Sequence, residues 1–132
     1  MKPEPIWITI IAAMISGLVG ALLSTVVYLK RENRKFKVDT LKRFAANRFD
    51  LKGDEFSRAL NEIYIVFNDS AKVMNALSDF HKAITSRQNE LGSQDTLVKL
   101  FKAMCKDVKI KHGEFTDSFF LIPFNTKPNC RL

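Results

Sequence analysis

Residues 6–29 read IWITIIAAMISGLVGALLSTVVYL and contain no charged side chain. A helix of this length rises about 36 Å, whereas the hydrocarbon core of a bilayer is about 30 Å thick. Trp7 and Tyr28 lie near the two ends of the run, and such amphipathic rings prefer the two membrane–water interfaces. The stretch therefore predicts a transmembrane helix over Ile6–Leu29, preceded by a short external N-terminus of residues 1–5.

The flanks of this run predict its orientation. Residues 30–37 read KRENRKFK, with five basic side chains and one acidic one, whereas the N-terminal flank carries only Lys2, Glu4 and the α-amino group. Because basic flanks stay in the cytoplasm, we expect a single-pass protein of the bacterial inner membrane with its N-terminus outside. A cleaved signal peptide has a shorter apolar region, about 7–15 residues, and small residues at its cleavage site. A buried core helix of this length is equally hard to place in so small a protein.

Small side chains recur every four residues along the predicted span. They lie on one broad side of the helix, opposite Ile and Leu side chains that suit acyl chains. Small residues at this spacing let two helix backbones approach closely in lipid. We therefore predict a homo-oligomer that associates through a small-residue stripe. The stripe consists of Ala12, Ala13, Ser16, Gly17, Gly20, Ala21 and Ser24.

The formal net charge of +7 is unevenly distributed. Residues 30–52 contain nine Lys/Arg and three Asp/Glu, whereas residues 53–132 contain eleven and ten. A basic collar next to a span is attracted to anionic lipid head groups, by ~1 kcal/mol per basic side chain. Binding of a soluble polyanion is the alternative interpretation. Duplex nucleic acid is not expected, because it would have to approach the negative membrane surface.

Three later stretches carry apolar residues at helical spacing. We expect helices over Glu55–Phe67, from Asp69 or Ser70 to about Arg87, and from an Asp95 cap to about Val108. Gly53 supplies a turn and Asp54 an N-cap before the first of them, and Gly92-Ser93 ends the loop before the last. The predicted fold is all-α, with a basic juxtamembrane helix at 30–52 and a cytosolic bundle of three to four helices at 53–124.

The C-terminal part has a different pattern. Residues 119–124 read FFLIPF and show no helical period, and Pro123 argues against a helix there. We expect an extended segment that packs across the bundle, followed by a loose tail at 125–132. If part of the segment is exposed, Phe119, Phe120 and Phe124 are candidate contacts for a partner protein.

Several patches resemble a family of uncharacterised bacterial and phage domains. They are TLKRFAANR at 40–48, ALNEIYIVF at 59–67, Lys72-Val73, the Leu97-Leu100-Met104 helix and IKHGEF at 110–115. The resemblance covers about residues 30–115 and implies one membrane helix followed by a small helical domain, with no assigned activity. In layout and charge the chain is also similar to membrane-anchored effectors of type III CRISPR defence. Those effectors bind a cyclic oligoadenylate messenger as oligomers and perturb the membrane.

No catalytic motif accompanies these features. The sequence has no phosphate-binding glycine loop, no nucleophile elbow and no zinc-protease motif. His81, Cys105, His112 and Cys130 lack the short spacing of a zinc site, and Cys105 lies in an apolar stripe. A disulfide is improbable in the cytoplasm. We therefore expect no enzyme, no metal and no cofactor.

Two basic groups are candidate binding sites for an anionic ligand. Arg offers bidentate contacts to phosphate and Lys a point charge. In an oligomer such groups repeat around the symmetry axis and could line one pocket. The candidate residues are Lys42, Arg43, Asn47 and Arg48 in the first group, and Lys109, Lys111 and His112 in the second.

The expected function is that of a non-enzymatic, membrane-anchored sensor or effector. Its cytosolic domain would bind an anionic ligand, with a cyclic oligonucleotide second messenger as one candidate, and act on the membrane through self-associated helices. Antiviral defence is the expected setting. The alternative is a passive membrane scaffold that recruits a partner protein through Phe119–Phe124.

Overall fold

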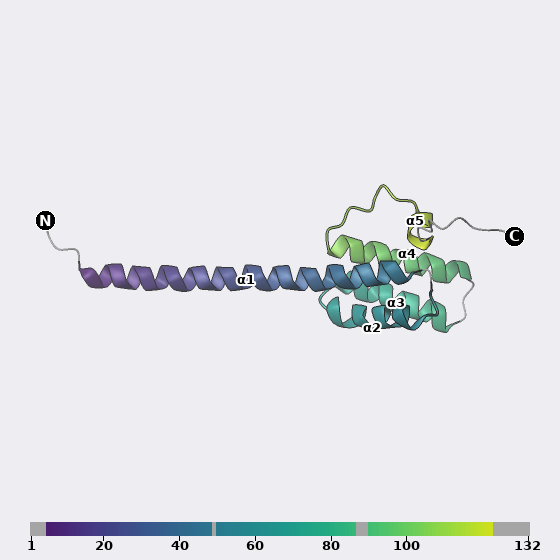
Figure 1. The fold of residues 1–132 in the computed structure, drawn as a ribbon, viewed down its shortest axis with the longest axis horizontal. Coiled ribbons are helices and arrows are strands. Elements are labelled where there is room, and N and C mark those ends of the chain that lie inside the picture. Colours follow the sequence, from purple (N-terminus) through teal and green to yellow (C-terminus); the bar gives the residue numbers. More distant parts are fainter. Residues whose placement is uncertain (1–4, 49, 87–89, 123–132) are drawn as a thin grey trace. The chain divides into compact units, whose positions relative to one another are not determined.

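The computed structural model describes residues 5–48, 50–86 and 90–122, and the side chains of all but residues 90 and 91 among them. These residues form five helices and no strand, which confirms the all-α fold class (Figure 1). The helices are α1 (Ile6–Asn47), α2 (Asp54–Val66), α3 (Ala71–Thr85), α4 (Glu90–Asp107) and α5 (Asp117–Leu121).

The chain divides into two compact units, unit 1 (Met1–Lys35) and unit 2 (Phe36–Leu132). Helix α1 supplies residues to both, and the division falls inside the predicted juxtamembrane segment 30–52. In unit 1, the described residues from Pro5 to Lys35 are largely exposed, including the large apolar side chains of the predicted span. Helix α1 is long and apolar enough to be a candidate membrane span, and no residue of its apolar window is buried.

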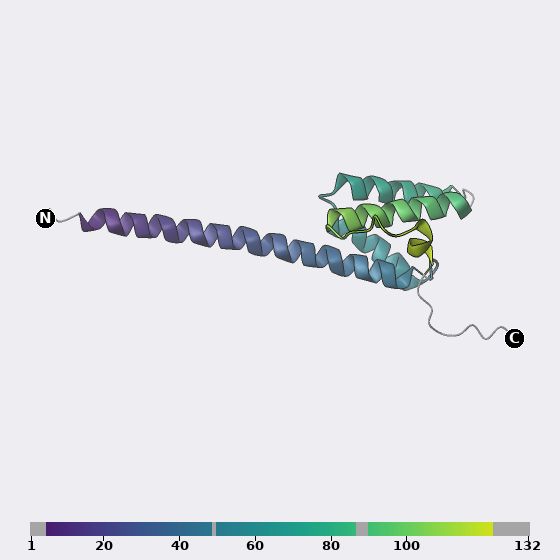
Figure 2. The same ribbon diagram turned by 90° about the horizontal axis from the view of Figure 1, so that it is seen from above.

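Unit 2 is a helical bundle built on the last third of α1. Within it, α1 and α3 run in one direction and α2 and α4 in the other, so successive helices are antiparallel (Figure 2). Phe44 of α1 is fully buried, with its ring centroid 5.3 Å from that of Phe56 and 5.5 Å from that of Phe101. Much of the remaining core lies at positions predicted from helical spacing, but Tyr64 and Ile84, which the same spacing placed on apolar faces, are 64% and 49% exposed. The remaining core includes Ile63, Phe67, Val73, Phe80, Leu97, Leu100, Met104 and Val108.

The predicted apolar stripes place both ends of α2 within one residue and the start of α3 within two. The amide of Gly53 donates to the Asp50 carbonyl at 3.0 Å, which forms the predicted turn. A Cβ at Gly53 would collide with the Asp50 side chain, so another residue there would require the exposed Asp50 side chain to move. Gly53 itself, not Asp54, holds the N-cap position of α2. Ser70 is the N-cap residue of α3, as one of the two alternatives predicted.

Two local predictions are wrong. Helix α4 begins at Glu90, so Asp95 is an interior residue and Gly92-Ser93 does not end a loop. The expected extended segment is also wrong for its first three residues, because α5 covers Asp117–Leu121. The short helix buries Phe120 against Phe101, with ring centroids 5.0 Å apart. This burial explains why a helix forms in a stretch whose apolar residues show no helical spacing. Phe124, the tail at 125–132 and the predicted helix end at Arg87 lie outside the described residues.

Candidate functional site

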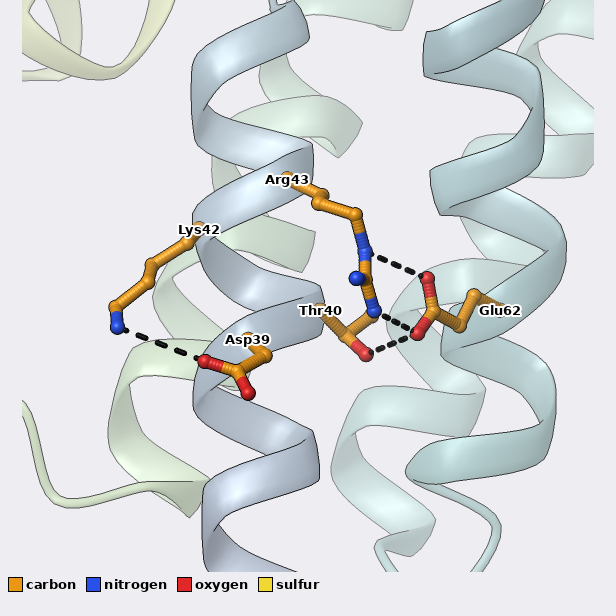
Figure 3. Close-up of polar contacts among 5 residues, drawn as sticks. All are labelled: Asp39, Thr40, Lys42, Arg43 and Glu62. Atoms are coloured by element: carbon orange, nitrogen blue, oxygen red, sulfur yellow. Dashed lines mark hydrogen bonds and ion pairs between the residues drawn. The ribbon is translucent and has the colours of Figure 1, made fainter.

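The first predicted basic group does not converge on one point. On α1, Lys42 and Arg43 extend to opposite sides of the helix (Figure 3). The Lys42 ammonium lies 3.5 Å from Asp39 on its own helix, and its side chain is 72% exposed. Arg43 donates from Nε to Glu62 of α2 at 3.0 Å and from its terminal nitrogen to the same carboxylate. The Arg43 guanidinium is therefore engaged inside unit 2.

Glu62 joins α2 to α1 through a third donor. The hydroxyl of Thr40, which is fully buried, donates to Glu62 Oε1 at 3.0 Å (Figure 3). A carboxylate that accepts from both a guanidinium and a buried hydroxyl fixes the rotation of α1 against α2. This role explains the polar character of Thr40 and Arg43 without an external ligand.

Asn47 and Arg48 also make internal contacts. Asn47 Nδ2 donates to the Arg43 carbonyl at 2.9 Å. The Arg48 guanidinium donates to the Ala45 carbonyl at 2.8 Å and to the Ile122 carbonyl at 3.5 Å, and it lies 6.0 Å from the ring centroid of Phe119. Burial lowers the pKa of Arg48, and its Nε is buried without a hydrogen-bond partner among the described residues. Of these four side chains, only Arg43 and Arg48 contact other elements of unit 2, and within one chain the four do not form one pocket.

A buried lysine that the sequence prediction overlooked lies at the start of unit 2. Lys37 of α1 is 8% exposed. Its ammonium lies 2.7 Å from Asp69, between α2 and α3, and 2.9 Å from Asp107 at the end of α4. It also lies 5.4 Å from the centroid of the Phe67 ring. Burial alone would lower the pKa of Lys37, but the hydrogen bonds to both aspartates raise it above its ordinary value.

The helical spacing of α1 already indicates that Lys37 is buried. Lys37 precedes Leu41 and Phe44 by four and seven positions on α1, so it lies on the buried face. A lysine on such a face requires carboxylate partners. The spacing does not show which carboxylates these are, because Asp69 and Asp107 lie far along the chain.

The second predicted basic group follows the end of α4, where Lys109 has a φ of 60°. The amide of Ile110 donates to the Cys105 carbonyl at 2.8 Å, and that of Lys109 donates to the Lys106 carbonyl at 3.2 Å. This pair of bonds is a Schellman cap, whose left-handed residue is usually glycine. A lysine there costs about 1–2 kcal/mol in backbone strain. Lys109 and Lys111 are exposed, and His112 Nδ1 lies 3.2 Å from the Ile110 carbonyl.

Two adjoining hollows bring further lysines to this group. They share Lys106 and His112. One is completed by Ser70, Lys72, Lys102, Ala103 and Asp107, and the other by Lys109, Ile110, Lys111, Gly113 and Glu114. Lys72, Lys102 and Lys106 were not predicted, although the i,i+4 spacing of Lys102 and Lys106 places them on one face of α4. We call the side chains of Lys72, Lys106, Lys109, Lys111 and His112 the basic face.

The carboxylates near the basic face do not neutralise it. Asp107 is paired with Lys37, and Asp117 with Lys102 at 2.6 Å. In the described part of the chain, Lys72, Lys106, Lys109 and Lys111 form no ion pair. Glu114 adds one carboxylate to the rim of the second hollow. Four lysines therefore face solvent around a shared depression, an arrangement that can bind phosphate groups.

Cys105 is 4% exposed and packs in the core, and burial raises the pKa of its thiol to about 11. Because the neutral thiol is favoured, it is a poor nucleophile at neutral pH. Across the described ranges, no three His, Cys, Asp or Glu side chains are grouped as metal ligands. His81 lines an apolar hollow between α2 and α3.

Cys105 gives a direct test of this packing. In a Cys130→Ser variant, we expect Cys105 to react with a thiol reagent at pH 8 about 100-fold more slowly in the native protein than in denaturant, since its pKa is raised by about two units. The stability contributed by the neutral thiol is complete below its ordinary pKa of 9.0 and falls as the pH rises toward 11. Equal rates in both states would show that Cys105 is accessible.

The predicted stripe residues of unit 1 are exposed, and so are the other residues of the predicted span. Ser16 Oγ donates to the Ala13 carbonyl at 3.1 Å, so this hydroxyl is satisfied within the helix. A Cβ at Gly17 or Gly20 would meet nothing within 4 Å. Within one chain, neither glycine is needed for space.

The predicted partner contacts are not equivalent. Phe120 is 2% exposed, so it is not available at the surface of unit 2. Phe119 is partly buried and stacks on Phe115 with ring centroids 4.2 Å apart. Phe115 is 47% exposed and was not predicted as a contact.

Comparison with known proteins agrees with the predicted resemblance to an uncharacterised family. Neither the curated proteins nor the solved structures contain a match to this chain. A family model of uncharacterised proteins does match, and it extends beyond the predicted residues 30–115 at both ends. The chain belongs to DUF6680, a family of unknown function, whose model covers residues 1–117.

Proposed function

We propose that this chain is a non-enzymatic, single-pass sensor or effector of the bacterial inner membrane. Its N-terminus lies outside, and unit 2 lies in the cytoplasm, where the basic face binds a phosphate-bearing ligand. Ligand binding acts on the membrane through self-associated α1 helices. The basic flank at 30–37 supports the orientation, and the exposed apolar side chains of unit 1 support the span.

One observation carries the proposal. Helix α1 provides both the apolar run and the central core residues of unit 2, Thr40, Leu41 and Phe44. A change in bundle packing therefore acts on the same helix that carries the predicted association stripe. Helix α1 extends from Ile6 to Asn47 and contributes residues to both units.

The soluble ligands to examine first are cyclic oligonucleotide messengers, and antiviral defence is the proposed setting. The passive scaffold has less support, because burial of Phe120 removes one of the three contacts on which it depended.

Self-association can be tested at the two glycines of the stripe. In the Gly17→Leu/Gly20→Leu variant, we expect the cross-linked oligomer in native membranes to fall at least about fivefold, which corresponds to ~1 kcal/mol of lost helix packing. A Cβ at either site meets nothing within 4 Å, so we take a loss of assembly to report contact between copies.

The matched control is Leu18→Ile/Leu22→Ile on the opposite side of α1, which should assemble like the original protein. Undiminished cross-linking in the double-leucine variant would refute association through the stripe, and with it the proposed route from unit 2 to the membrane.

A further inference from the structure

We propose that the basic face is a docking site for anionic phospholipid head groups, with Lys106, Lys109 and Lys111 as its principal contacts. The inference rests on the proposed function and names the ligand class of the same site. It depends on where the face lies in unit 2, on its charge and on the backbone at Lys109.

The face lies at the end of unit 2 where the chain enters from the predicted span. The contacts of Lys37 with Asp69 and Asp107 bring the start of this unit, the α2–α3 connection and the end of α4 together. Figures 1 and 2 show the last turn of α4 and the α2–α3 connection at this same end. Lys37 follows Leu29 by only eight residues. The basic face thus lies at the end of unit 2 that contains the first residues of the unit, which follow the predicted span closely in sequence.

The chemistry of the face favours lipid over a soluble oligonucleotide. Its contacts are lysines, which act as point charges, and no arginine of the described ranges lines either hollow. Phe, Tyr and Trp side chains, on which bases stack, are also absent from the described linings of both hollows, where His112 contributes the one aromatic ring. Point charges spread along an open edge match a layer of phosphate groups.

The conformation of Lys109 supports the same conclusion. Glycine would relieve the strain of its left-handed backbone, yet the position carries a long cationic side chain next to Lys111. The strained position places one more charge on the open edge of the unit. Fold stability alone would favour glycine there, so the lysine is better explained by binding.

The test uses the full chain in vesicles with a fluorophore at Gly113→Cys. A side chain at Gly113 meets nothing within 4 Å, and Cys105 is buried with a raised pKa, so only the new thiol is labelled once Cys130 is changed to Ser. The control label is at Ser86→Cys, which is exposed at the other end of α3. Quenching by a lipid with a spin-labelled head group reports proximity to the bilayer surface.

We expect stronger quenching at position 113 than at 86 when phosphatidylglycerol is present, and a smaller difference in phosphatidylcholine alone. Each lysine near an anionic surface contributes roughly fivefold to the docked population. Lys106→Glu/Lys111→Glu should therefore reduce docking by at least roughly 25-fold and abolish the excess quenching. Lys52→Glu/Lys82→Glu, with the same change in charge on exposed residues elsewhere, should preserve it.

Lys109→Gly separates docking from folding, because it relieves strain while removing one charge. This variant should unfold no more readily than the original protein, and its docked population should still fall roughly fivefold, which lowers the excess quenching. Equal quenching at 113 and 86, or quenching that survives charge reversal, would overturn the inference. A soluble cyclic oligonucleotide that protects Lys106 and Lys111 from acetylation without any lipid-dependent quenching would also overturn it, while leaving the proposed function intact. The proposed function fails separately, in the cross-linking of the glycine variant.

Discussion

Phe44→Ala is expected to lower the free energy of unfolding of unit 2 by about 3–5 kcal/mol. The Phe44 ring is fully buried and touches the rings of Phe56 and Phe101, so alanine leaves a cavity between α1, α2 and α4. The measurement is urea unfolding of the full chain in detergent micelles, followed by loss of helical circular dichroism. A loss of this size is a large part of the stability of a small domain.

Phe36→Ala is the matched control, because it removes the same side chain from the same helix at a position that is 56% exposed. It should change the free energy of unfolding by less than about 0.5 kcal/mol. If both variants were equally stable, α1 would not be a core helix of unit 2.

Lys37→Met should destabilise unit 2 by about 2–3 kcal/mol, somewhat below the ~3–5 kcal/mol typical of breaking a buried ion pair. Methionine keeps most of the apolar stem but leaves Asp107, whose side chain is 21% exposed, without its partner. Asp69 loses less, because its side chain is 52% exposed and can be hydrated. The same urea experiment measures the difference.

The control for charge is Lys42→Met on the same helix, whose ion pair with Asp39 is exposed and should contribute less than ~1 kcal/mol. The pH dependence gives a second check. Because the folded pKa of Lys37 is raised, its contribution is complete below the ordinary value of 10.5 and is lost as the pH rises through the folded value. A Lys37→Met variant as stable as the original at neutral pH would contradict this assignment.

Local sequence patterns predicted much of this fold, because amphipathic spacing reports which face of a helix is buried. Phe56 and Ile63 on α2, Phe67 at its C-cap, and Leu97, Leu100 and Met104 on α4 are buried as expected. Helix limits were predicted less well where packing overrides a local signal. Helix α4 continues through Gly92 and Ser93 to Glu90, although these residues often mark a loop.

The candidate site was harder to predict, because its polar contacts join distant residues. Glu62 lies nineteen positions from Arg43, and Asp107 lies seventy from Lys37. No local pattern indicates such pairs. Basic residues at 42–48 were therefore interpreted as a ligand site, whereas Arg43 and Arg48 contact other elements of unit 2, namely Glu62 and the Ile122 carbonyl. The lysines that do remain open, such as Lys72 and Lys106, come from two helices and are brought together only by the fold.

The placement of Thr40, Leu41 and Phe44 on α1 has a consequence for proteolysis. A cut within residues 30–35 would release a fragment that keeps every buried residue of unit 2, including Lys37. A cut after Asn47 would instead remove the central helix and expose the apolar faces of α2 and α4. Under the proposed topology, a cut that releases unit 2 and a cut that destroys it are thus separated by little more than three helical turns of one segment.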